Sequence, residues 1–345
     1  MSRARDFADL AGSADAGGLT GKNMVVNGSV AVSQRGTSFS APNGTYTLDR
    51  MRCAQANSAD TISQQTFTAG QTDVPGSPKN YLRFAFGAAT ANRVLETRIE
   101  DVYTGSGQSI TLSFYAKASA AHTSTIEMTQ SFGSGGSSDV AFGTQSYDIT
   151  TSWQRFEFTL SCPSISGKTI GAGNYLSAAF IRSLSAGPSI NVDIALLQLE
   201  IGEQATPFEH RSFGDEYNRC LRYTYVPRND STSGSDGSTI ATGYCQTGSV
   251  GVYFIEFPVP MRDIPGLTTI STADSLEQAY HNAGATSHNV TAMSYVASIS
   301  GNQKACFTIG SASFSGGEGA HCRYAKGVFG DGTSKDNIII FSSEL

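Results

Sequence analysis

Apolar and polar residues alternate one by one in several short segments, and this pattern constrains the fold more than any other feature. Residues 111–117 and 155–160 both follow it, and their apolar positions are Leu112, Phe114, Ala116, Phe156, Phe158 and Leu160. Because successive side chains of a strand point to opposite faces, each segment predicts a β-strand with one buried and one solvated face. The intervening polar residues, such as Thr111 and Ser113, are expected on the solvated face.

Segments of the same kind recur at residues 124–132, 175–182 and 190–201. Gly- and Ser-rich stretches, such as residues 105–107 and 133–138, lie between them and indicate turns. Charged residues make up only 15% of the chain and aromatic residues 10%, a composition that excludes an intrinsically disordered protein. The spacing of short strands and turns therefore predicts an all-β fold built around a β-sandwich.

A change of pattern near residues 202–213 indicates a domain boundary. Pro207 lacks a backbone donor and is expected to end the last strand of the first set, and residues 215–222 form a helical candidate. The sequence thus predicts a tip and linker at residues 1–22 that contains a short helix at residues 3–10, followed by two β domains at residues 23–210 and 211–345.

The second domain is also expected to be a β-sandwich-like fold. Its predicted strands lie near residues 249–257, 267–271, 290–299, 304–314, 321–329 and 337–341. Residues 250–257 are apolar on both faces, which indicates a strand inside a sheet or at a subunit interface.

Charge and cysteine content exclude further classes of protein. The formal net charge of −6 argues against a nucleic-acid partner, and no apolar run approaches the roughly 18 residues of a membrane span. The six cysteines are scattered without a C-x-x-C pair, so we expect mostly reduced thiols. No apolar segment follows Arg3 and Arg5, so the sequence predicts no secretory signal and synthesis in a cytoplasm.

Several segments resemble the tail-fibre and host-attachment proteins of bacteriophages. The segment NMVVNGSVAVSQRGTSF at residues 23–39, with residues 44–51, resembles the opening of their jelly-roll module. The segment QLEIGEQATPFEHRSF at residues 198–213 resembles its closing strand and exit, and residues 216–225 resemble the helix and strand that follow. The first domain is therefore similar to a jelly roll of the carbohydrate-binding-module type.

The resemblance implies a virion protein made in the bacterial host cytoplasm. It implies that the tip at residues 1–22 docks on other tail or capsid proteins, and that the chain assembles as a homotrimer. We expect the second domain to be distal and to bind the receptor, which would be a surface glycan or an outer-membrane protein of the host. The sequence leaves the position on the virion, tail or capsid, open.

Two aromatic residues are the natural candidates for sugar contact. Tyr115 shares the polar face of its segment with Lys117 and is the candidate for receptor or glycan binding. Trp153, the single tryptophan, opens a strand whose next residues alternate inward, so we expect it to pack in the core or at an edge.

Nothing in the sequence indicates catalysis, a cofactor or a metal centre. No G-x-S-x-G or phosphate-binding loop occurs, and Asp193 and Glu200 lack the loop of a calcium site. The histidines are isolated, which argues against zinc. The carboxylates that could form a glycosidase pair are interpreted as solvated charges, and they are Glu96, Glu100, Asp101, Asp215 and Glu216.

Three functions remain in competition. The first is a non-enzymatic tail fibre that attaches the virion to the host by multivalent binding. The second is a capsid or tail decoration protein that stabilises the particle. The third is a polysaccharide depolymerase, which the absence of an internal repeat disfavours.

Overall fold

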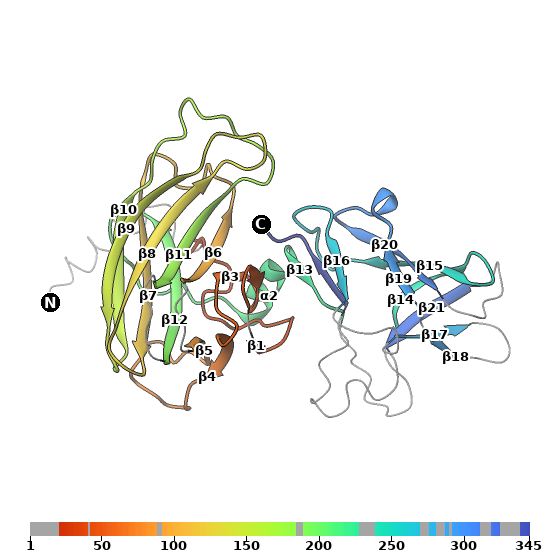
Figure 1. Cartoon of the computed structure of the whole chain (residues 1–345), viewed down its shortest axis with the longest axis horizontal. Helices are drawn as coiled ribbons and strands as arrows, with labels where there is room; N and C mark the ends of the chain where they lie inside the picture. The colour runs from red at the N-terminus through yellow and green to blue at the C-terminus, as the bar shows by residue number, and fades with distance from the viewer. Residues whose placement is uncertain are drawn as a thin grey trace, which may run out of the picture. The chain divides into compact units, whose positions relative to one another are not determined.

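The chain folds into two β-rich units, shown in the computed structural model of Figure 1. The first unit runs to Tyr217 and includes Leu345, and the second covers Asn218–Glu344, so the division falls within helix α2 (Phe213–Leu221). The predicted helix at residues 3–10 lies outside the described residues. The structure describes residues 21–40, 42–87, 92–183, 189–227, 239–269, 276–280, 287–289, 292–310, 319–324 and 339–345.

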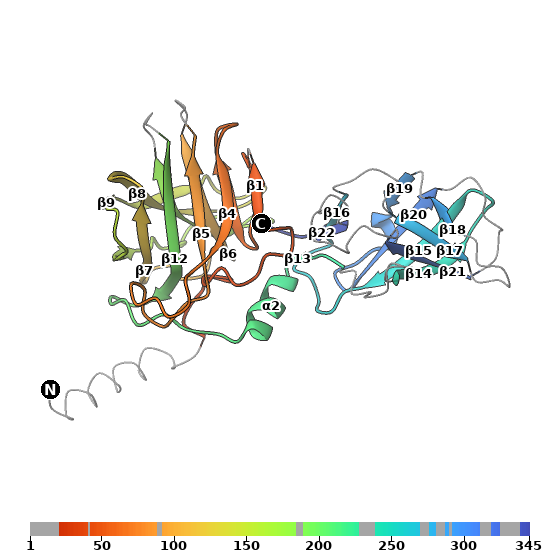
Figure 2. The ribbon, with the colours of Figure 1, turned by 90° about the horizontal axis from the view of Figure 1, so that it is seen from below.

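Two six-stranded antiparallel sheets build the first unit. The β12 sheet, in the order β1-β4-β5-β12-β7-β10, contains β1 (Ser38–Ser40), β4 (Thr61–Thr66), β5 (Asn80–Phe86), β12 (Ile190–Ile201), β7 (Ser109–Ala118) and β10 (Gln154–Ser161). The β11 sheet, in the order β2-β3-β6-β11-β8-β9, contains β2 (Thr45–Tyr46), β3 (Met51–Gln55), β6 (Arg93–Glu100), β11 (Tyr175–Ser183), β8 (His122–Ser131) and β9 (Val140–Ile149). Figure 2 shows β7, β12, β5 and β4 side by side. The predicted jelly-roll β-sandwich is confirmed.

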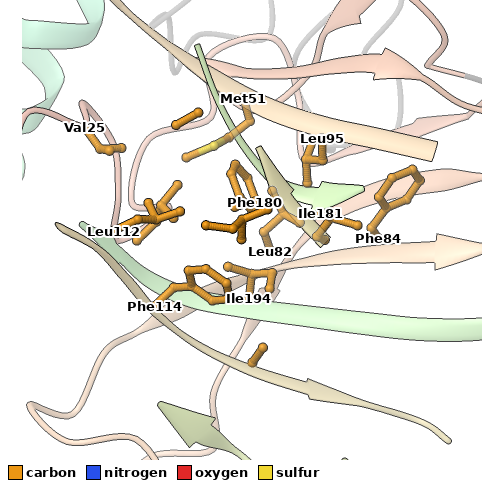
Figure 3. Packing of buried hydrophobic residues seen from close by; sticks show 14 of the residues in the cluster. Val25, Met51, Leu82, Phe84, Leu95, Leu112, Phe114, Phe180, Ile181 and Ile194 are labelled. Atoms are coloured by element: carbon orange, nitrogen blue, oxygen red, sulfur yellow. The ribbon is translucent and has the colours of Figure 1, made fainter. Parts of the chain in front are cut away.

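The two sheets pack through the side chains that alternate inward. Leu112 and Phe114 of β7 face Phe180 and Ile181 of β11 (Figure 3), and all four are almost fully buried. Full burial of a side chain of this size stabilises the fold by about 1.5–3 kcal/mol. The inward positions expected from the alternation of residues 111–117 are confirmed.

A β-bulge in β12 changes which of its side chains face the core. Ile194 points into the core, and so does Leu197 three positions later. The register with β7 shifts between Ala195 and Gln198, and Leu196 adopts a φ of 53°. Ala195 and Leu196 consequently both lie on the outer face of the β12 sheet, which gives this face a small apolar centre.

The outgoing segment, residues 202–212, covers one end of that outer face. Thr111 Oγ1 donates to the carbonyl of Gly202 at 2.8 Å and is fully buried, and Ser113 is buried as well. The expectation that Thr111 and Ser113 face solvent is wrong, because a segment distant in the sequence lies over them.

Two carboxylates that the sequence placed among solvated charges are buried. Glu96 accepts hydrogen bonds from Arg52 at 2.8 Å and from Arg98 at 2.9 Å. Glu216, on α2, lies 3.5 Å from the guanidinium of Arg211. Since both carboxylates are buried and paired with arginines, the interpretation as solvated charges is wrong for them.

A junction between residues 21–27 and the outgoing segment closes the first unit. The backbone N–H of Asn23 donates to Glu209 Oε2 at 2.7 Å, and Arg211 donates to the carbonyls of Asn23 and Val25. Burial by itself would raise the pKa of Glu209, but the N–H groups of Asn23 and Gly21 and the charge of Arg211 overcome this and hold the pKa below its usual value.

The second unit contains two further antiparallel sheets. The smaller one, in the order β13-β22-β16, contains β13 (Thr224–Tyr225), β22 (Ile339–Ser342) and β16 (Gly266–Thr269). The larger one, in the order β18-β17-β21-β14-β15-β20-β19, contains β18 (Ser287–Asn289), β17 (Leu276–Tyr280), β21 (Gly319–Tyr324), β14 (Thr239–Cys245), β15 (Val250–Glu256), β20 (Lys304–Gly310) and β19 (Ala292–Tyr295). A short 3₁₀ helix, η2 (Ala297–Ile299), precedes β20.

One hydrophobic cluster joins these two sheets. Phe341 of β22 belongs to the same buried cluster as Tyr253 of β15 and Phe307 of β20, so the unit is sandwich-like as expected. The strand β15 pairs with β14 and β20 and therefore lies inside its sheet, as its apolar faces predicted. All six cysteines of the chain are free and buried. Within the described residues, no helix is long and apolar enough to span a membrane.

Candidate functional site

Aromatic side chains gather on the outer face of the β12 sheet. Tyr115, the candidate from the sequence, lies on β7 between Ala195 of β12 and Arg155 of β10. It is half-buried and belongs to an aromatic cluster that packs on the apolar centre formed by the bulge. The members of this aromatic cluster are Phe67, Tyr81, Tyr115, Trp153 and Phe208.

Three of the aromatic rings touch one another. The ring centroid of Phe67 lies 4.7 Å from that of Tyr81 and 5.3 Å from that of Trp153, and the Tyr81 and Trp153 centroids lie 5.6 Å apart. Trp153 directly precedes the edge strand β10 and is half-buried, so the expected edge packing is confirmed. Its partners come from β5 and from the segment after β4, which sequence reasoning did not identify.

Two segments frame the aromatic cluster. Residues 67–79, which connect β4 to β5, bury Val74 against Ala195 and Leu196. The outgoing segment supplies Phe208, whose ring stands edge-on to His210 at 5.1 Å. The bulge places two consecutive apolar residues on this face, which is why both segments can pack there.

A cavity of about 330 Å³ opens between these two segments. Its walls are apolar on several sides, and Arg155 and His210 supply its charged or ionisable groups. Small-molecule sites have this mixture of apolar walls and a few placed polar groups, and volumes from about 300 Å³ upward. The residues that line it include Pro75, Tyr115, Arg155, Leu196, Phe208 and His210.

Charged side chains flank the aromatic rings on the same face. Arg83 holds Asp193 through two hydrogen bonds of 2.7 and 2.9 Å, and the hydrogen bond to Asp193 raises the pKa of the Arg83 guanidinium. Burial, and after it the Asp193 charge, raises the pKa of the Tyr81 phenol, so Tyr81 stays a hydroxyl donor at neutral pH. Lys117 Nζ lies 5.2 Å from the ring centroid of Trp153, within range of a cation–π contact.

The two carboxylates considered for calcium have protein partners. Asp193 is bound by Arg83 through both oxygens. Glu200 accepts hydrogen bonds from Gln198 at 2.9 Å and from the backbone N–H of Thr206 at 2.8 Å. In the part of the chain that the structure describes, no group of three His, Cys, Asp or Glu side chains is close enough to hold a metal ion.

This arrangement is suited to binding and positioning a polar ligand with an apolar face. Tyr and Trp rings offer flat apolar area, while their polar edges and the neighbouring Arg83, Asp193 and Lys117 donate or accept hydrogen bonds. The C–H faces of sugar rings and their hydroxyl rims match both properties.

Comparison with known proteins yields similarity of low degree. No family model and no curated protein matches the chain. The chain is similar to the N-terminal cellulose-binding domain of β-1,4-glucanase C of Cellulomonas fimi, at 14% identity and a TM-score of 0.28, over 39% of this chain and 88% of that one. It is also similar to the family 11 carbohydrate-binding module of a cellulosomal cellulase of Clostridium thermocellum, at 14% identity and a TM-score of 0.31, over 49% of this chain and 98% of the module.

A phage protein is among the similar structures. The enzymatically active domain of tailspike protein 4 of bacteriophage CBA120 matches 52% of this chain and 21% of its own, at 14% identity and a TM-score of 0.31. With TM-scores below 0.5, none of these similarities bears on function.

Proposed function

We propose that the protein is a bacteriophage host-attachment protein that binds a surface glycan without cleaving it. The observation that carries the proposal is the aromatic cluster, half open on the outer face of the β12 sheet and flanked by Arg83, Asp193 and Lys117. Half-exposed rings beside polar groups stabilise a domain less than fully buried rings would. A ligand role therefore accounts for them better.

Weak single-site binding is sufficient for such a protein. Assembly as a homotrimer, which the resemblance to tail fibres implies, would hold three copies of the site together. Binding of linked sites to one surface raises the overall affinity by a factor of about 10²–10⁴ without new contacts. That the second unit is distal and binds a receptor stays a separate prediction, since the aromatic cluster lies on the first unit.

The test compares two aromatic substitutions in the full chain. Trp153→Ala removes the ring that joins Phe67 to Lys117, and binding to host polysaccharide in affinity electrophoresis should weaken at least about tenfold, or ~1.4 kcal/mol. The matched control is Tyr103→Ala, because Tyr103 is a well-exposed aromatic residue outside the cluster. Equal binding by both variants would refute the assignment of the site.

Whole particles separate attachment from the other two functions. Virions that carry the Trp153→Ala chain should adsorb poorly to host cells and remain as heat-resistant as the parent virions. Heat-fragile particles with normal adsorption would instead support a decoration protein. Release of reducing ends from host polysaccharide by the purified chain would support a depolymerase.

A further inference from the structure

The cavity beside Tyr115 has an unusual distribution of charge. Arg155 and His210 line it, and among the described residues no Asp or Glu does. Tyr115, Leu196 and Phe208 are among the residues that form the rest of its lining. The cavity thus combines apolar walls with positive or neutral donors.

The surrounding carboxylates are already engaged. Both oxygens of Asp193 are bound by Arg83. Glu157 is half exposed outside the cavity, where it forms an ion pair of 2.9 Å with Arg155. Arg155 also donates to the carbonyl of Thr206 at 2.7 Å, and a guanidinium with five N–H donors has further donors to offer.

A second cation on this face has no carboxylate partner. Lys117 lies two residues after Tyr115 on the same face of β7, and within the described residues it forms no ion pair. Its contact is the ring of Trp153, which keeps the ammonium group beside the aromatic cluster. Lys117 and Arg155 stand against the carboxylate of Glu157 at the β7–β10 end of the face, and this excess of positive charge favours an anion.

We propose that this cavity binds an acidic sugar residue, with its ring against Tyr115 and Phe208 and its carboxylate bound by Arg155 and His210. The inference rests on the proposed function, since it names the chemical class of the glycan. A volume of about 330 Å³ accommodates one sugar ring rather than a long chain. Arg is well suited to the task, because its planar donors match the two oxygens of a carboxylate.

The experiment uses pairs of oligosaccharides in which methyl esterification removes the negative charge. Trigalacturonate and 3′-sialyllactose are each compared with their methyl esters, and binding to the full chain is followed by the fluorescence of Trp153. The free acids should bind at least about tenfold more tightly than the esters, and the difference should shrink at high ionic strength because salt screens exposed charges.

Two arginine variants provide the control. Arg155→Gln should bring binding of the acids down to the level of the esters. Arg182→Gln should leave the difference intact, because Arg182 is similarly exposed and ion-paired, to Glu127 at 3.3 Å, but lies on β11 in the other sheet.

Three results would overturn the proposal: equal binding of acids and esters, equal effects of the two arginine substitutions, or no binding of any of the four compounds. Failure of the proposed function would instead appear as equal binding of host polysaccharide by the Trp153→Ala and Tyr103→Ala variants. If host polysaccharide still binds in a Trp153-dependent manner while acids and esters do not differ, the glycan site stands and only its preference for an acidic sugar is wrong.

Discussion

Removal of the Asp60 carboxylate should destabilise the first unit much more than removal of the Asp193 carboxylate. Asp60 is fully buried and accepts hydrogen bonds from Arg93 Nε at 3.0 Å and Nη2 at 3.1 Å. It also accepts the backbone N–H groups of Asn57 at 2.7 Å and of Gly87 at 2.9 Å. Arg93 opens β6 in one sheet and Asp60 directly precedes β4 in the other, so the pair ties the two sheets together.

The magnitude follows from the burial of the partner. Asp60→Ala leaves the guanidinium of Arg93 without its counter-charge at a site where that side chain is 2% exposed. Breaking a buried ion pair in this way costs about 3–5 kcal/mol. For a unit of this size, 1 kcal/mol corresponds to about 2–4 °C in Tm, so the loss amounts to roughly 6–20 °C.

The assay exploits the single tryptophan. Trp153 lies in the first unit, so its fluorescence during urea unfolding reports that unit and not the second. The comparison variant is Asp193→Ala, which removes an equally buried carboxylate but leaves Arg83 29% exposed and able to be hydrated. We expect the free energy of unfolding to fall by only about 1 kcal/mol in that variant.

A double substitution completes the test. Asp60→Ala and Arg93→Met together should cost less than the sum of the two single changes, with a coupling of at least ~1 kcal/mol, because neither charge is then left alone. If Asp60→Ala costs no more than Asp193→Ala, burial of the arginine is not what makes the pair important.

Three further predictions concern single groups. Because the pKa of Glu209 is lowered on folding, its contribution to stability is present above its unfolded value of about 4.5 and is lost as the pH falls. Between pH 6 and pH 3.5, the free energy of unfolding should therefore fall less in Glu209→Gln than in the parent chain, as urea unfolding at the two pH values can show. Thr111→Val removes the hydrogen bond to Gly202 and should lower the free energy of unfolding by about 1 kcal/mol in the same assay. Burial raises the pKa of Cys53 and of Cys322 to about 12, so neither thiol should react with iodoacetamide at pH 8 until the chain unfolds, as mass spectrometry can check.

Local pattern was sufficient to predict β7, β8, β10, β11 and β12 of the first unit, but not β1 to β6 or β9. β12 has the bounds expected from the sequence, and α2 lies within two residues of its predicted start. Strict alternation arises within a single strand that has one buried and one solvated face. It can therefore be recognised without knowing which strands lie beside it.

The outer faces could not be predicted in the same way. Thr111 and Ser113 have the polarity of exposed residues, yet the outgoing segment covers them. Tyr81 could have been found, because it alternates with Leu82 on β5 as Tyr115 does with Phe114 on β7. These two tyrosines belong to one cluster because of the strand order and the bulge in β12. Neither feature can be recognised from the local sequence.

The junction at Asn23, Glu209 and Arg211 has a mechanical consequence. The chain arrives at the first unit and leaves it through neighbouring segments, which are tied by short hydrogen bonds such as the 2.7 Å contact of Glu209 with Asn23. Tension applied to the chain on both sides of this unit would act on the junction before it reaches the sheets. If the chain is pulled from both sides, the face that carries the aromatic cluster should therefore keep its shape while the junction bears the load.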